Sequence, residues 1–320
     1  MAMTTGGTAP DAGPFPAEPF SPGLLGRAAR AFAASVPERP ADDGLFGPRS
    51  VTWRLAGDMS TPLVGIRALL LQALHPLAMA GVDQHSAWRT DPGARLASTS
   101  AYIMTISVGD TRAAQQAAAR VRKIHESVTG TDPATGQPYA ASDPRLLLWV
   151  HNALTESQLA CTRLYGSITD ADADRYVAEQ VAAAGLVGIP AGLAPRAGAE
   201  LAAYFDAVRP ELTCTPAAAA ATTHLLDYLG DAAGDQDAAQ MWQDIADAAI
   251  ATLPGWAVAL YGGRVPRIPE AAARFGDVPA SSRTEVRQAL GVLDAVFLGE
   301  PGILEARQRL RLRIRAAGGA

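Results

Sequence analysis

Cysteine is nearly absent from this chain of 320 residues, which contains only Cys161 and Cys214. Two cysteines are too few for a disulfide framework, and the lack of a C-x-x-C spacing excludes a zinc knuckle. This scarcity favours a reducing compartment. The first 20 residues also lack the basic region and the apolar stretch of a secretory signal, so we expect a cytoplasmic protein.

Long hydrophobic runs and a strong net charge are lacking as well. The longest apolar run, Leu69 to Val82, is interrupted by Gln72 and His75 and is shorter than the roughly 20 residues of a membrane span. Charged residues make up 18% of the chain and the formal net charge is −5, so no global field favours nucleic acid or anionic lipid. The sequence therefore predicts no transmembrane segment and no nucleic-acid partner.

Helical periodicity dominates what is present. Hydrophobic residues make up 48% of the chain, which is ample for a buried core. Residues 1–20, rich in Pro, Gly, Ala and Thr, are expected to form a flexible arm, and residues 21–316 a single helical domain. No heptad persists and no internal repeat is found, so the prediction is an all-α fold, an irregular orthogonal bundle of helices.

Apolar spacing, capping residues and Pro or Gly boundaries predict the individual helices. They cover residues 21–34, 62–81, 94–108, 111–129, 144–165, 169–185, 196–208, 215–230, 236–252, 281–297 and 300–315. Pro76 lies inside the second of these helices, so we expect a kink just after His75. Residues 131–142 are expected to form a loop, and the Pro and Gly residues between 254 and 266 a linker.

Four of the five histidines lie in one part of the sequence: His75, His85, His125 and His151. His125 is the first candidate for a metal ligand, because Arg122 precedes it by one helical turn and both border an apolar stripe. A helical imidazole can bind haem iron while a nearby arginine pairs with a haem carboxylate. The alternative is a core histidine that is hydrogen-bonded to a backbone carbonyl.

Further candidates lie on the neighbouring helices. His151 is the second candidate ligand, or else a structural histidine bonded to an adjacent helix. His75 faces either a carbonyl freed at the kink or the distal side of a cofactor. Arg95 and Thr99 offer a cation and a hydroxyl one turn apart. The alternative for this pair is a surface arginine and a threonine bonded to its own helix backbone.

Several other enzyme classes lack their motifs. A ferritin-like di-iron site needs Glu-x-x-His pairs, but Thr129 follows Glu126 and Leu159 follows Glu156 at that spacing. No GxSxG, HExxH, P-loop or GxGxxG motif is present. Cys214 is a weak alternative as a haem thiolate.

The C-terminal segment 307–315 contains five arginines, at every second position. One interpretation is a surface that binds an acidic partner or a membrane. The other is a solvated last helix whose cations suit its C-terminal end.

A set of motifs, in this order, resembles the family of oxygenase MpaB and rubber oxygenase (latex clearing protein), formerly a domain of unknown function. The motifs are TWRL (52–55), LLLQALHPLAMAGVDQHS (69–86), Arg95 with Thr99, RVRKIHESVTG (120–130), GQPYAASDPRLLLWVHNAL (136–154) and LYG (164–166). The resemblance covers about residues 45–260. It implies an all-helical protein with a globin-like core that binds haem b and uses dioxygen, as the relatives that cleave polyisoprene or a farnesyl side chain do.

Residue by residue, the resemblance implies that His125 is the proximal haem ligand and that Arg122 is the arginine three positions before it. Arg95 and Thr99 match the arginine and threonine of the distal pocket. The lysine that precedes this threonine in the rubber-cleaving branch is Ser98 here.

Two other family positions do not match. Thr129 replaces a second arginine after the proximal histidine, and the glutamate base has no counterpart, with Gln72 and His75 in that neighbourhood. We expect a small hydrophobic, isoprenoid-like substrate inside the cell rather than extracellular rubber.

Three hypotheses follow from these residues. In the first, the chain is a haem b oxygenase or oxidase in which His125 binds the iron, Arg122 and Arg95 lie near the haem carboxylates, and Thr99 and His75 polarise dioxygen. In the second, it binds haem or a hydrophobic ligand without catalysis, because membership of a family does not fix chemistry. In the third, it is a helical partner protein without a cofactor.

Overall fold

The computed structural model describes residues 24–318 except 59, 232–235, 276–283, 285, 289, 292–293 and 295–301. Over these residues the fold is all-α, as the sequence predicts, with one small hairpin as its only described sheet. Most of the predicted helix for residues 281–297 lies outside the described residues.

The elements follow one another along the chain with short connections. They are α1 (Leu24–Ser35), α2 (Val51–Ala56), α3 (Thr61–Gln72), α4 (Pro76–His85), η1 (Ala87–Arg89), α5 (Pro92–Val108), α6 (Thr111–Ser127), β1 (Thr129–Thr131), β2 (Pro138–Ala140), α7 (Pro144–Tyr165), α8 (Asp170–Val187), α9 (Gly198–Val208), η2 (Arg209–Glu211), α10 (Pro216–Asp231), α11 (Gln236–Ala251), α12 (Gly255–Tyr261), η3 (Gly262–Arg264), α13 (Arg267–Phe275) and α15 (Ile303–Ala316).

The predicted helix 62–81 is two helices, because α3 and α4 meet at an angle of 105°. His75 is the N-cap of α4 with an extended backbone, and Pro76 occupies the first helical position. A proline disfavours the α conformation of the residue before it, so the chain leaves one helix and starts another. The kink was therefore predicted in the right place, but its size was not.

Two predictions for connecting segments were wrong. The expected loop 131–142 contains β2, which pairs antiparallel with β1 in a register that puts Gly130 opposite Tyr139. This hairpin packs on α4, since a Cβ added to Gly81 would lie 3.5 Å from the Tyr139 ring. The expected linker 254–266 contains α12 and η3.

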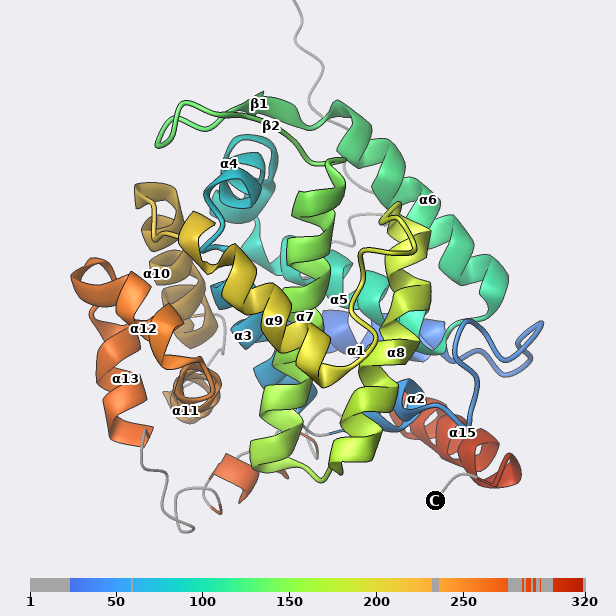
Figure 1. The fold of residues 1–320 in the computed structure, drawn as a ribbon. Helices are drawn as coiled ribbons and strands as arrows, with labels where there is room; N and C mark the ends of the chain where they lie inside the picture. The colour runs from blue at the N-terminus through green and yellow to red at the C-terminus, as the bar shows by residue number, and fades with distance from the viewer. Residues whose placement is uncertain are drawn as a thin grey trace, which may run out of the picture.

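The arrangement places α7 in the middle of the molecule (Figure 1). In this view α9 crosses in front of α7, α6 runs along the outer edge, and the β1–β2 hairpin covers one end of α4. Consecutive helices α5 and α6 pack against each other, and α6 also packs against α8. Among the described residues, no single helix has the length and apolar character to cross a membrane, although two bent helix pairs pass that test together.

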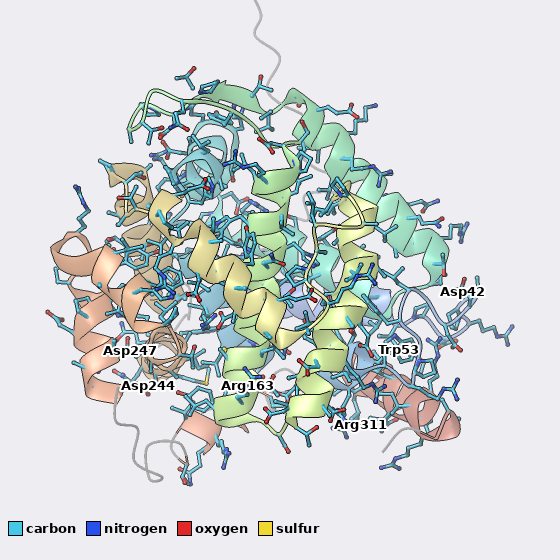
Figure 2. All side chains as sticks on the ribbon, viewed as in Figure 1. Asp42, Trp53, Arg163, Asp244, Asp247 and Arg311 are labelled. Carbon is cyan, nitrogen blue, oxygen red and sulfur yellow. The ribbon has the colours of Figure 1, made fainter. Side chains whose placement is uncertain are left out.

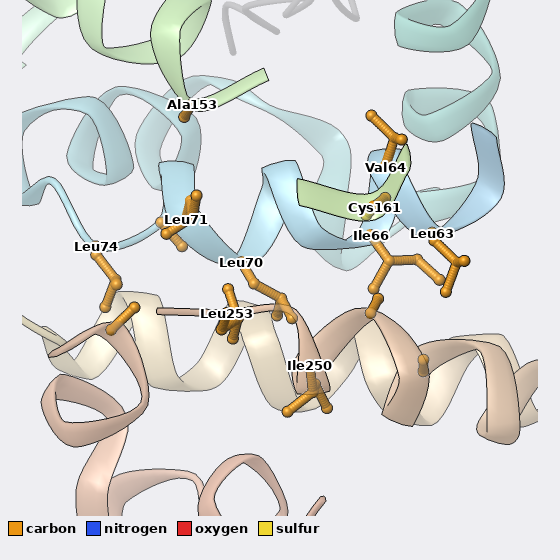
Figure 3. Close-up of a cluster of buried hydrophobic side chains, with 14 of the residues drawn as sticks. Leu63, Val64, Ile66, Leu70, Leu71, Leu74, Ala153, Cys161, Ile250 and Leu253 are labelled. Carbon is orange, nitrogen blue, oxygen red and sulfur yellow. The ribbon is translucent and has the colours of Figure 1, made fainter. Parts of the chain in front are cut away.

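The main core lies between α3, α7 and α11. Figure 3 shows Ile66, Leu70 and Leu74 pointing to the side on which Ile250 and Leu253 lie, and all five belong to one buried cluster. Burial of these large aliphatic side chains contributes about 1.5–3 kcal/mol each. The core therefore holds together three helices that are distant in sequence.

One buried polar network lies within this core. Arg67 is only 1% exposed and forms a two-pronged ion pair with Glu156. It also donates to Ser157 Oγ at 2.8 Å and to the carbonyl oxygen of Thr252 at 3.0 Å. The guanidinium thus links α3 with α7 and with the end of α11.

Gly44→Ala is expected to lower the free energy of unfolding by about 2–4 kcal/mol, because both its backbone angle and its surroundings require glycine. Gly44 has φ +68°, and an added Cβ would lie 2.0 Å from the carbonyl oxygen of Gly109, at the α5–α6 connection. Gly136→Ala is the matched control, since Gly136 has φ +70° but nothing within 4 Å. Equal losses of unfolding free energy in the two variants, measured by urea unfolding, would contradict the close approach of Gly44 to Gly109.

Candidate functional site

One face of α5 is buried at its C-terminal end and accessible at its N-terminal end. The residues on this face follow at steps of three and four, as one helix face requires: Arg95, Thr99, Tyr102 and Ile106. Ile106 is 6% exposed, Tyr102 and Thr99 are half-buried, and Arg95 is exposed. Protein atoms therefore cover only the C-terminal half of this face.

On the side of α6 that faces α5, burial changes in the opposite direction along the chain. Ala114 and Ala118 are buried, whereas Val121 and His125 are half-buried and Ile124 is 57% exposed. Ile106, Ala114 and Ala118 belong to one hydrophobic cluster, so the two helices run antiparallel and close together at that end. Their other ends carry accessible or half-buried residues, Arg95, Thr99, Ile124 and His125, and we call this part of the surface the α5–α6 opening.

Arg95 and His125 interact across this opening. Desolvation lowers the pKa of His125 below its usual value, and the positive charge of Arg95 lowers it further. Desolvation also lowers the pKa of Arg95, although its side chain is accessible to solvent. Protein atoms therefore surround the guanidinium without covering it.

Thr99 forms two hydrogen bonds with Arg95, one as donor and one as acceptor. Its hydroxyl donates to the Arg95 carbonyl oxygen at 2.9 Å and accepts from Arg95 Nη1. The sequence left open that Thr99 bonds to its own helix backbone. The structure contains this bond, together with a contact between Thr99 and the Arg95 guanidinium. This pair fixes the direction of the guanidinium at the mouth of the opening.

Arg122 is directed elsewhere. Its Nη1 donates to the carbonyl oxygen of Leu186, in the last turn of α8. The side chain lines a groove of about 570 Å³ between α6 and α8, whose other lining residues are Arg112, Gln115, Gln116, Ala119 and Leu186. Arg95, and not Arg122, is therefore the cation that interacts with His125.

His151 lies on the N-terminal half of α7, at the end of the molecule where the hairpin joins α6 to α7. Desolvation lowers the pKa of His151 to about 4, so its imidazole is neutral at pH 7. The ring makes no hydrogen bond to the described residues. The preceding residue, Val150, is 41% exposed although α7 runs through the middle of the molecule.

His75 lies on another side of α7. Its ring packs against Trp149, with 5.9 Å between ring centroids, and Trp149 is two residues before His151 and so on the opposite helix face. Desolvation lowers the pKa of His75, while Glu211, 4.0 Å from Nε2, acts in the other direction. No described contact brings His75 to Arg95 or His125.

Tyr102 is a residue of the site that the sequence reasoning missed. Its position three residues after Thr99 was the available signal, since this spacing puts both on one helix face. Desolvation raises the pKa of its phenol to about 12, with Arg122 acting in the other direction, so the hydroxyl stays protonated. Cys214 is buried and desolvation raises its pKa, which disfavours the thiolate that a haem ligand requires.

The fold and the opening define a class: an all-α protein in which a half-buried imidazole lies within electrostatic reach of a guanidinium on the neighbouring helix. The chain belongs to the family of the ER-bound oxygenase mpaB/B′ and rubber oxygenase catalytic domain, whose family model matches residues 53–281. The family resemblance of the motifs is thus confirmed, and the matched range includes every candidate site residue. Comparisons with curated proteins and with solved structures gave no match.

The half-buried, desolvated histidine of α7, His151, makes stability depend on pH. The folded-state pKa of His151 is about 4, against a usual 6.5, so only the unfolded chain takes up this proton between these values. The free energy of unfolding is therefore expected to fall as pH drops from 6.5 to about 4, by up to about 3 kcal/mol. In urea unfolding, His151→Gln should show a shallower fall than the wild type. Equal slopes of unfolding free energy against pH in the two proteins would contradict the assignment of this effect to His151.

Proposed function

We propose that this chain is a haem b-dependent oxygenase that acts with dioxygen on a small hydrophobic, isoprenoid-like substrate. The observation that carries the proposal is the position of His125 within electrostatic reach of Arg95 at the α5–α6 opening, in a chain of an oxygenase family. A helical imidazole and a cation at this spacing suit a macrocycle that carries both iron and carboxylates.

The residues at the opening fit haem. An iron ligand must be a neutral imidazole, and desolvation with the nearby Arg95 favours the neutral form of His125. Ile124 presents an exposed apolar side chain to which the face of a porphyrin can bind. A single histidine is sufficient to hold a metal whose other ligands come from a macrocycle.

Each residue then has a distinct task. His125 would hold the iron, and Arg95 would pair with a haem carboxylate or with a polar group of the substrate. Thr99 would keep Arg95 in place and offer its hydroxyl to a polar group of the substrate or to dioxygen. When bound, the haem would supply the redox-active iron needed to activate dioxygen. His151 would contribute a second neutral imidazole from α7.

The test is reconstitution of the purified protein with haem, followed by absorption spectroscopy, iron analysis and oxygen-uptake measurements with farnesol and geranylgeraniol. A Soret band with substrate-dependent oxygen uptake would support the oxygenase. A Soret band without uptake by any isoprenoid would favour a non-catalytic haem protein. Absence of both a Soret band and iron would overturn the proposal in favour of a helical partner protein without a cofactor.

A further inference from the structure

The C-terminal arginines divide into two groups by direction. Three of them donate to backbone carbonyl oxygens of the N-terminal part of the chain. Arg307 Nη2 reaches Gly57 at 3.4 Å, Arg309 Nε reaches Val36 at 3.0 Å, and Arg313 Nη2 reaches Asp42 at 3.1 Å. Arg311 and Arg315, by contrast, are exposed, and Figure 2 labels Arg311 on α15.

This division bears on the two interpretations of the arginine run, a surface that binds an acidic partner or a membrane and a solvated last helix. A surface for a partner or a membrane would present all of its cations outward, but most of these reach back into the molecule. Helix α15 lies beyond residues 53–281, the part matched by the family model, and packs against α1 and α2. The run therefore fastens a segment outside the matched range to the start of the chain.

Arg313 makes the most extensive of these contacts. Its guanidinium lies over the Trp53 ring, 4.5 Å from the ring centroid, and pairs with Asp43 at 2.9 Å. The same Nη2 donates to the Asp42 carbonyl oxygen. An arginine that stacks on an aromatic ring while it donates to two acceptors has little freedom left, so it holds the loop at residues 42–43 firmly.

That loop in turn caps α6. Asp42 Oδ1 accepts from the backbone N–H of Thr111, the first residue of α6, and from that of Gly44, both at 2.8 Å. These two bonds are the main cause of the lowered pKa of Asp42. Asp110, the N-cap of α6, accepts from the amide of Ala113, two residues after Thr111. The N-terminus of α6 is thus held by its own N-cap and by a carboxylate that Arg313 keeps in place.

We propose that Arg313 is a positioning residue: through Asp42 it fixes the N-terminus of α6, the helix that presents His125 to the α5–α6 opening. The haem part of this inference rests on the proposed function. The contact between α15 and α6 does not, because it is made by the protein alone.

The first test is amide hydrogen exchange at Thr111, Arg112 and Ala113. Arg313→Met should speed this exchange by roughly tenfold or more, the factor that corresponds to loss of one charge-assisted hydrogen bond. Arg311→Met is the matched control, because it removes an outward arginine from the same helix and should leave the exchange unchanged. Arg313→Lys keeps the charge without the planar fork and should restore only part of the protection. Equal exchange in Arg313→Met and wild type would overturn the proposal.

The second test is the rate of haem loss from the reconstituted protein, measured by transfer to an excess of apomyoglobin. Positioning predicts faster loss in Arg313→Met than in Arg311→Met, at a urea concentration where both remain folded. If exchange at α6 rises but haem loss does not, Arg313 only stabilises the helix and its positioning role fails. If the wild type binds no haem, the proposed function fails, and the exchange measurement alone decides whether Arg313 holds α6.

Discussion

Arg67→Ala is expected to lower the free energy of unfolding by about 3–5 kcal/mol, the usual cost of breaking a buried ion pair by removing one partner. The guanidinium is almost fully buried and bonds Glu156, Ser157 and the Thr252 carbonyl oxygen. Its removal leaves the Glu156 carboxylate without a counter-charge and opens a cavity between α3 and α7. Urea unfolding followed by the helical circular dichroism signal measures this loss.

Two further variants separate charge from volume. Arg67→Met fills much of the space, so the part of the loss that remains reports the unpaired carboxylate. Arg163→Ala is the control on α7, because Arg163 is exposed and lies 4.0 Å from Asp170, a surface pair that contributes about 1 kcal/mol or less (Figure 2). A loss below 1 kcal/mol for Arg67→Ala would show that the network contributes little to stability.

His125→Ala should weaken haem binding at least a hundredfold and abolish the Soret band of the reconstituted protein, because it removes the proposed iron ligand. Stability without haem should change by about 1 kcal/mol or less, since the half-buried ring has no hydrogen bond to the described residues. Absorption titration measures the first effect and urea unfolding the second. Added imidazole should restore part of the Soret band, because it can occupy the space that the ring leaves.

The controls for this prediction are the other histidines. His85→Ala should keep haem, since His85 is exposed at the end of α4 and bonds Tyr139 at 3.1 Å. His151→Ala should keep the band with a shifted maximum. Loss of the band in His151→Ala and not in His125→Ala would move the iron ligand to α7.

Most helices were predictable from local signals. Asp143 and Pro144 marked the start of α7, and in the structure Asp143 accepts from the Arg145 amide as an N-cap. The hairpin was not predictable in this way, because its strands have three residues each and depend on packing of Tyr139 against α4. Short strands held by tertiary contacts leave no period in the sequence.

The site was predictable only in part. Helix periodicity and the family motifs pointed to Arg95 and His125, and in the structure the charge of Arg95 acts on His125. The direction of Arg122 depends on Leu186, which is 64 residues away, so no local pattern reveals it. His75 packs on a different face of α7 from the face that carries His151. Their separation depends on how the helices pack, which no local pattern in the sequence reveals.

The uncovered halves of α5 and α6 have a thermodynamic consequence. A molecule that fills the opening binds the folded chain and not the unfolded one, so it raises the melting temperature by mass action. At a concentration of one hundred times its Kd, such a ligand adds about 2.7 kcal/mol to stability. A rise in the melting temperature therefore reveals binding at the opening, where Ile124 is exposed, even for molecules that undergo no reaction.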